Sequence, residues 1–402
     1  MAAAPAIETS SPAPRLVAID FFRGLSLIFV LLNHLDWAAG PTLIRRVTPV
    51  GLGYSDAAEA FVFLSGLTFG WVYSARILRD GLKRNITKVL SRSLQIYAGY
   101  VVTLLLIAAF SVAPVSMADW TRNALRIGDD ESFSGAVLRG LMMETSPFGI
   151  GILALYVVLL PGMVLLLAAA RRSRLVVLAV SLATYIAVQP PVNWTIVNPS
   201  WFSGWSFHPF AWQFLFLVGM LIGERLQRTQ TPLPRNRTRA ALSVAVVLCG
   251  FLYGLRRDAA MLTGTSDHVV WQWIDPSESW LIAKPRLGPF RVVHLLALAC
   301  LAASLLPVAS RFWQARWIKP VVATGRHSLT IYCFGTLLVY ASSVPFYWFG
   351  SDPAVVIIVA VDACLLQFAL AGWLERRRQT RTSDARLPEG ALNPAPDAAG
   401  TS

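Results

Sequence analysis

Residues 16–36 read LVAIDFFRGLSLIFVLLNHLD, an apolar run of the length that crosses a lipid bilayer as one α-helix. Four ionisable side chains interrupt it: Asp20, Arg23, His34 and Asp36. Such groups are costly inside a membrane segment, and where they occur they usually belong to a functional site. The stretch therefore predicts a transmembrane helix that carries part of a site.

The rest of the chain repeats this apolar pattern. Of its 402 residues, 55% are hydrophobic and 14% are charged, whereas soluble domains carry about 25% charged residues. Because lipid cannot satisfy backbone polar groups and no strand alternation is seen, the sequence predicts an all-α, polytopic membrane protein. About ten transmembrane helices are predicted, at residues 16–36, 57–76, 93–113, 148–170, 174–190, 209–224, 239–255, 290–308, 321–341 and 354–374.

The basic residues predict the orientation of these helices. Lys and Arg outnumber Asp and Glu by 35 to 22, a net charge of +13, and they gather in alternate connections and in the C-terminal tail. Such connections face the cytoplasm, so both termini are expected there. The net charge of +13 is then explained by the basic cytoplasmic connections, and it does not indicate a nucleic-acid partner. We expect a disordered tail over 1–14, a membrane domain over 15–375, and a basic and then disordered cytoplasmic tail over 376–402.

The first predicted helix carries its cation and its imidazole on one face. The eleven-residue step from Arg23 to His34 turns about 1100°, about 20° past three full turns, and spans about 16 Å along the axis. A guanidinium suits a phosphate or a carboxylate, and an imidazole suits proton transfer near neutral pH. Two structural alternatives remain open: Arg23 could extend to the interface or pair with Asp20, and His34 could bond a neighbouring helix.

The second predicted helix brings two carboxylates to the depth of His34. Asp56 and Glu59 are three residues apart at its start. Either could orient the imidazole, as the acidic member of a catalytic triad does. Asp56 could instead cap the helix, since an aspartate is favoured at that position. Further along, Gly66 and Gly70 form a GxxxG pattern that predicts close approach of another helix.

Tryptophans gather in the loops predicted to face outward. They could form an interfacial aromatic belt or a surface on which sugar rings stack. These residues are Trp194, Trp201, Trp205, Trp212, Trp271, Trp273 and Trp280.

Three stretches resemble the OpgC family, which is named for succinyl transfer onto osmoregulated periplasmic glucans. They are IDFFRGLSLIFVLLNHLDW (19–37), SDAAEAFVFLSGLTFGW (55–71) and ATGRHSLTIYCFGT (323–336). The resemblance extends to the wider acyltransferase-3 group, in which an Arg, ten residues and a His mark the first helix and an acidic residue marks the next. Arg23, His34 and Glu59 occupy those places. Many members have a second His where this chain has Gly335, so a mechanism that needs that His does not carry over.

The resemblance implies a multi-pass bacterial inner-membrane enzyme that moves an acyl group from cytoplasmic acyl-CoA to a periplasmic glycan hydroxyl. Arg23, aided by Arg326, would bind the polar part of acyl-CoA. His34 would act as general base, with Glu59 or Asp56 orienting it, and either direct attack or an acyl-histidine intermediate would suit. The acyl group, the acceptor and the oligomeric state are left open. No metal-binding motif is present.

Two other classes of protein fit part of the sequence. A transporter or flippase of a glycan or acyl donor would also carry polar residues within its spans. Many transporters contain two related halves, and no such repeat is seen here. A non-catalytic scaffold for envelope assembly would tolerate substitution of Arg23 and His34.

Overall fold

The computed structural model describes residues 14–40, 42–111, 125–127, 131–197, 199–202, 204–231, 236–263, 279–306 and 311–384. Within these ranges the chain is all-α, with short 3₁₀ turns and no strand. The helices are α1 (Pro14–Ala39), α2 (Ala57–Asp80), α3 (Leu82–Ser111), α5 (Phe133–Leu141), α6 (Gly151–Ala170), α7 (Arg174–Ala187), α8 (Pro209–Thr229), α9 (Arg237–Thr263), α11 (Pro289–Leu305), α12 (Lys319–Arg326), α13 (Ser328–Ala341), α14 (Ser343–Phe349) and α15 (Pro353–Asp384).

Each predicted span coincides with helix. Among the residues described, seven helical segments are long and apolar enough to cross a membrane, while α7 and α11 are apolar but shorter. The membrane character of the chain is thereby supported, and the number ten and the cytoplasmic termini remain predictions.

The helix boundaries differ from the predicted ones where a helix includes polar residues or where an apolar run is not one continuous helix. Helix α3 begins at Leu82, whereas the predicted span begins at 93. The prediction starts late because the first turns of the helix are polar and hydropathy does not detect them. The span predicted over 321–341 is broken at His327, which ends α12 and precedes α13. Helix α5 lies between the spans predicted at 93–113 and 148–170, where no transmembrane helix is predicted.

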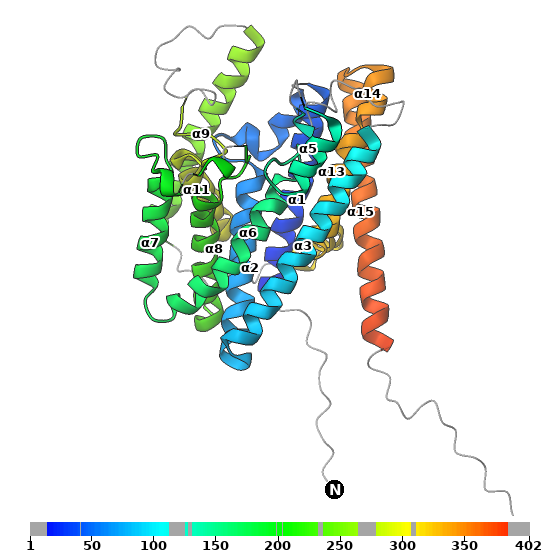
Figure 1. Cartoon of the computed structure of the whole chain (residues 1–402). Coiled ribbons are helices and arrows are strands. Elements are labelled where there is room, and N and C mark those ends of the chain that lie inside the picture. The colour runs from blue at the N-terminus through cyan, green and yellow to red at the C-terminus, as the bar shows by residue number, and fades with distance from the viewer. Residues whose placement is uncertain are drawn as a thin grey trace, which may run out of the picture.

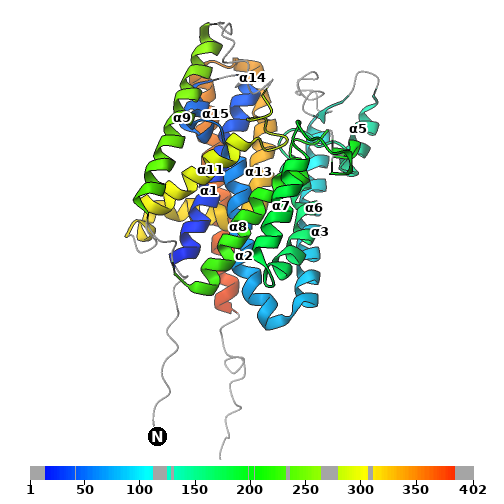
Figure 2. The same ribbon diagram turned by 90° about the vertical axis from the view of Figure 1, so that its left-hand side faces the viewer.

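The helices run side by side with α1 near the centre of the bundle (Figures 1 and 2). Helix α1 packs against α2, α12 and α13. The first turn of α1 and the last turn of α15 lie at the same end of the bundle (Figure 1). Helix α15 continues to Asp384, beyond the boundary predicted at 375. The tails were predicted over 1–14 and 376–402; Pro14 begins α1 and residues 376–384 continue α15, and the rest of both tails lies outside the described residues.

Glycines bring α2 and α8 into backbone contact. A Cβ atom added at Gly66, Gly70, Gly219 or Gly223 would lie between 1.9 and 2.2 Å from a carbonyl oxygen of the other helix. Only glycine permits this separation, as in the small-residue contacts of membrane helices. The close approach predicted from Gly66 and Gly70 is therefore confirmed, and α8 supplies a matching pair.

The same device joins α1 to α12. A Cβ atom at Gly24 would lie 1.9 Å from the Val321 carbonyl oxygen, and one at Gly325 would lie 1.8 Å from that of Asp20. Arg23 is next to one of these glycines, so its side chain is held beside the start of α13.

Candidate active site

A cavity of about 340 Å³ lies at the far end of α1 and contains both His34 and Asp56. We call it the His34 cavity. Helix α1 contributes five residues, the cap and first turn of α2 contribute two, and the remaining residues come from the segment around α6, from loops and turns, and from α13. The lining residues are Val30, Asn33, His34, Asp36, Trp37, Val50, Asp56, Ala58, Phe148, Ile152, Phe207, Lys284 and Tyr332.

His34 lines this cavity with its ring open to the space. Its ring centroid lies 4.8 Å from that of Phe148, and a Cβ atom on Gly149 would lie 3.7 Å from Nδ1. Gly149 has a φ of +86°, a conformation that glycine adopts without strain, and the turn before α6 passes beside the imidazole. Within the described residues, His34 makes no hydrogen bond or ion pair, which leaves both ring nitrogens available to a ligand.

Asp56 and Glu59 form a reciprocal cap at the start of α2. Asp56 Oδ1 accepts a hydrogen bond from Ala58 N at 2.7 Å, and Asp56 N donates to Glu59 Oε2 at 2.9 Å. This is the capping box, in which each side chain satisfies a free backbone group. The capping interpretation of Asp56 is therefore confirmed, and Glu59 shares that role.

The two carboxylates are also ion-paired, with cations that the sequence did not single out. Asp56 Oδ2 lies 2.7 Å from Lys284 Nζ and 3.4 Å from Arg291 Nη2. Glu59 Oε1 lies 2.5 Å from Arg291 Nε, and its side chain is 0% exposed. Burial alone would raise the pKa of Asp56, but Lys284 and Arg291 hold that pKa below its usual range.

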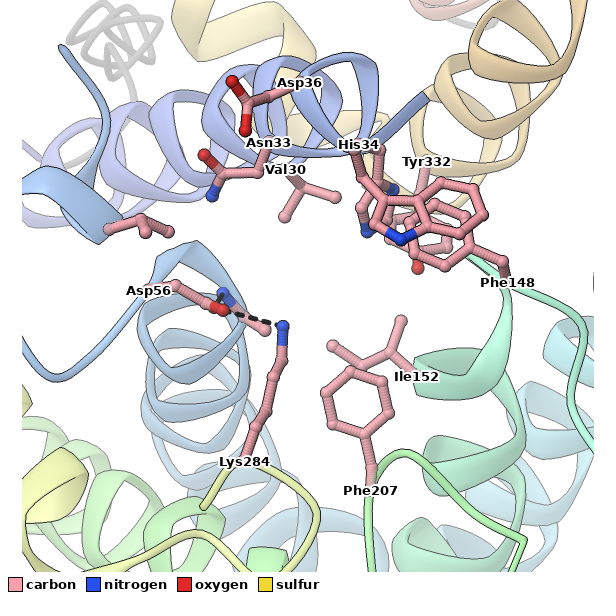
Figure 3. Close-up of a pocket in the computed structure, with 13 residues that line it drawn as sticks. Val30, Asn33, His34, Asp36, Asp56, Phe148, Ile152, Phe207, Lys284 and Tyr332 are labelled. Atoms are coloured by element: carbon pink, nitrogen blue, oxygen red, sulfur yellow. Dashed lines mark hydrogen bonds and ion pairs between the residues drawn. The ribbon is translucent and has the colours of Figure 1, made fainter. Parts of the chain in front are cut away.

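Neither carboxylate is hydrogen-bonded to His34, so the structure lacks the orienting contact that the sequence suggested. Figure 3 shows Asp56 and Lys284 on one side of the cavity and His34 on the other. Glu59 does not line the cavity at all. The group that faces the imidazole is thus an Asp56–Lys284 pair rather than a free carboxylate.

A second cavity, of about 260 Å³, contains Arg23, and we call it the Arg23 cavity. Arg23 Nη2 donates to Ser328 Oγ at 2.6 Å, and its guanidinium lies 5.7 Å from the centre of the Phe61 ring. Arg76 and Arg92 line the same cavity, together with the hydroxyl-bearing Ser65, Thr68 and Ser328. Three guanidiniums around one cavity form a site suited to an anion.

Arg326, the expected helper of Arg23, lies elsewhere. Its Nε lies 3.2 Å from Asp20 Oδ2 and its Nη1 lies 2.9 Å from Glu375 Oε1. His327 Nε2 lies 3.1 Å from the other oxygen of Glu375. Arg326 does not line the Arg23 cavity, so the expected pairing of Arg23 with Arg326 in one site is not present. Its position favours a structural role that joins α1, α12 and α15.

The two cavities meet at Tyr332. Among the described residues it is the one side chain that lines both. Its hydroxyl donates to the Gly149 carbonyl oxygen, and Thr336 Oγ1 donates to the same oxygen at 3.4 Å. Arg23 and His34 therefore lie in two neighbouring cavities along α1, with Tyr332 between them.

The loop tryptophans do not behave as one group. Trp205 and Trp212 are buried, and their indole nitrogens donate to the carbonyl oxygens of Met143 (2.8 Å) and Pro285 (3.1 Å). Trp194 and Trp201 are exposed, Trp280 is half-buried, and Trp271 and Trp273 lie outside the described residues. The tryptophan at the cavity is another one, Trp37, which is 45% exposed and stacks on Phe148 with ring centroids 3.7 Å apart.

Several site residues escaped the sequence argument. Arg76 and Arg92 are among the basic residues from which the orientation of the helices is predicted, and nothing local indicates that they share a cavity with Arg23. Lys284 and Arg291 stand in no recognisable motif, and Tyr332 lies within the stretch 323–336 that resembles the OpgC family, although that resemblance assigns it no role. For metals, the described residues contain no group of three or more His, Cys, Asp or Glu side chains that could hold an ion.

Comparison with known proteins agrees with this architecture. The family model described as OpgC protein matches residues 15–379, nearly the whole described region. Neither a search of curated proteins nor a search of solved structures found a match. The match covers far more than half of the chain, and it includes all the helices that build the two cavities. The chain therefore belongs to the OpgC protein family.

Proposed function

We propose that this protein is a membrane-bound O-acyltransferase that moves an acyl group from acyl-CoA on the cytoplasmic side to a glycan hydroxyl on the periplasmic side. The observation that carries the proposal is the placement of Arg23 and His34 on one helix, each in its own cavity, with Tyr332 between them. Membership of the OpgC family supports a periplasmic glucan as acceptor and succinyl as the acyl group.

The Arg23 cavity suits the donor. Coenzyme A carries phosphates at one end and a thioester at the other, and Arg23, Arg76 and Arg92 offer guanidinium donors for the phosphates. Arg92 is exposed, while Arg23 lies deeper beside Ser328. The phosphates would bind near the mouth, and the acyl-bearing arm would extend along the cavity toward Tyr332.

The His34 cavity suits the reaction. As a general base, His34 removes the proton from the sugar hydroxyl while that oxygen attacks the thioester carbonyl carbon. The tetrahedral intermediate collapses, the carbon–sulfur bond breaks, and the CoA thiolate leaves and takes up a proton. Lys284, held by Asp56 on the opposite wall (Figure 3), is placed to stabilise the negative oxygen of that intermediate.

The mouth of the His34 cavity suits a sugar. Trp37 and Phe148 provide stacked aromatic rings, and sugar rings pack their C–H faces on such surfaces. Asn33 Oδ1 is buried without a hydrogen-bond partner in the described part of the chain. An apolar wall with a few polar groups is typical of small-molecule sites, and Asn33 could accept a bond from an acceptor hydroxyl.

Substitution of His34 tests the proposal. His34→Gln keeps a polar side chain of similar size but cannot act as a base, so acylation should fall by about 10²- to 10⁴-fold. Glycan acylation is measured by mass spectrometry in cells with equal amounts of protein in the membrane. His327→Gln is the control, because His327 lies outside both cavities and should retain activity. Undiminished acylation by His34→Gln would end the proposal.

A purified-protein assay separates this function from transport. Labelled acyl-CoA is offered with candidate glucans to protein in detergent, where no gradient or compartment exists. An acyltransferase forms a labelled ester on the glucan. A transporter or flippase forms none, and this result would favour that alternative.

A further inference from the structure

We propose that Tyr332 is the partition between the Arg23 cavity and the His34 cavity, and that it limits the size of the acyl group that passes from one to the other. The limit on acyl size rests on the proposed function. The sealing of the two cavities from each other does not, because it would hold for any protein with these two spaces.

The position of Tyr332 carries the inference. Of the described residues, it alone lines both cavities, although its side chain is only 6% exposed. Its ring lies 6.4 Å from the Phe61 ring, which in turn lies under the Arg23 guanidinium. Its hydroxyl bonds the carbonyl of Gly149, the residue that lies beside His34. Tyr332 thus contacts the surroundings of both functional groups.

The neighbouring helices show how thin the partition is. On α2, Ala58 lines the His34 cavity and Phe61 lines the Arg23 cavity; on α6, Ile152 and Leu153 divide in the same way. On each of these two helices, the residues that line the His34 cavity differ from those that line the Arg23 cavity. Helix α13 contributes the same side chain to both, so at this point the separation is one tyrosine thick.

A partition is needed here because each cavity has an exposed residue at its mouth, Trp37 in one and Arg92 in the other. Those two residues belong to opposite ends of the path along α1. If water filled both cavities without interruption, protons would cross the membrane along it. The aromatic ring, fixed by its bond to Gly149, blocks that path while the site is empty.

Acyl transfer requires the same ring to let the acyl group through. The thioester enters from the Arg23 cavity, whereas His34 lies in the other, so the acyl carbonyl must pass beside Tyr332. A short acyl chain fits beside the ring after a small side-chain rotation. A long chain does not fit unless the ring is removed.

The first experiment measures proton leak, which does not depend on enzymatic activity. Full-length protein is reconstituted in vesicles that contain a pH-sensitive dye, and proton entry is followed after an acid pulse. Tyr332→Ala should leak several-fold faster than wild type, and Tyr332→Phe, which keeps the ring, should match wild type. Tyr332→Leu serves as the test variant if the alanine variant does not fold.

Tyr340 offers a matched control on the same helix. It is buried, its hydroxyl donates to the adjacent Phe148 carbonyl at 3.0 Å, and it lines neither cavity. Tyr340→Ala therefore controls for the loss of a buried tyrosine bonded to the same turn. If Tyr332→Ala leaks no faster than Tyr340→Ala, the partition is refuted.

The second experiment measures acyl size. Acetyl-, succinyl- and octanoyl-CoA are compared as donors, and Tyr332→Ala should raise transfer of octanoyl relative to acetyl several-fold, whereas Tyr340→Ala should not. An unchanged ratio refutes the size limit. If wild type transfers no acyl group but Tyr332→Ala leaks, the proposed function fails and the partition stands. If wild type transfers acyl groups and neither Tyr332→Ala nor Tyr332→Leu leaks faster than Tyr340→Ala, the partition is refuted and the proposed function stands.

Discussion

Glu59 Oε1 lies 2.5 Å from Arg291 Nε, and this contact joins α2 to α11 across 232 residues of sequence. Both side chains are largely removed from solvent, Glu59 completely. The same arginine reaches Asp56, so one guanidinium serves the whole cap of α2. Arg291 therefore supports the residues around the His34 cavity without lining the cavity itself.

Removing Arg291 should destabilise the protein strongly. In Arg291→Met, Glu59 would remain buried without its cation, and breaking a buried pair in this way costs about 3–5 kcal/mol. Thermal unfolding in detergent measures the loss. Lys284→Met is the control: the Lys284 side chain is 38% exposed, and without it Asp56 still keeps its contact with Arg291, so the loss of stability should be smaller. Equal losses of stability in the two variants would contradict this account.

Arg76 and Arg326 should differ in their effect on donor binding. Arg76→Ala should raise the KM for acyl-CoA about tenfold or more with little change in kcat. The substitution removes a charged guanidinium that donates hydrogen bonds to the phosphates of acyl-CoA. Arg326→Gln should leave this KM unchanged and lower stability instead, because Arg326 is committed to Asp20 and Glu375. Steady-state kinetics with acyl-CoA as the varied substrate decide the matter. A raised KM in Arg326→Gln alone would reverse the assignment.

Trp37 should act on the acceptor and not on the donor. Trp37→Ala should raise the KM for the glucan about 2- to 10-fold, the range expected from loss of an aromatic contact, and Trp37→Phe should retain most of the affinity. Trp348, an exposed tryptophan on α14 that does not line the cavity, provides the control. A change in the acyl-CoA KM, with none in that of the glucan, would show that the stacking assignment is wrong.

His208 should make the stability of the protein depend on pH. It precedes α8, is 3% exposed, and burial together with the charge of Arg286 lowers its pKa to about 4. The unfolded chain, with a pKa of about 6.5, binds more protons below that pH. Stability should therefore fall as the pH drops from about 6.5 to about 4 and level off below.

Melting temperatures at a series of pH values, for wild type and His208→Gln, test this effect. The variant has no imidazole to protonate, so its melting temperature should fall less across the window. Identical profiles for wild type and His208→Gln would exclude His208 as the source.

The sequence predicted what depends on local pattern. Hydropathy located helix at each predicted span, and helical periodicity placed Arg23 and His34 on one face. The GxxxG pattern identified Gly66 and Gly70 as a contact surface, although it could not identify α8 as the partner. Where local pattern was weak, as in the polar first turns of α3, the prediction stopped short.

The rest of the site depends on contacts between distant segments. Lys284 and Arg291 reach Asp56 and Glu59 only after the chain has folded, and neither stands in a recognisable motif. The family resemblance led to the prediction that Arg326 aids Arg23 in donor binding, but carboxylates on two other helices pair with Arg326. A single sequence does not reveal such competition for a charge.

The glycine contacts between α2 and α8 also bear on how the protein moves. Two helices whose backbones interlock at four points cannot slide past each other without collision of their carbonyl oxygens. Helices α2 and α8 should therefore move as one rigid unit, which fixes the position of the cap at the start of α2. Any movement that admits a substrate is then expected outside this pair, for example at His327, where the helix is interrupted between α12 and α13.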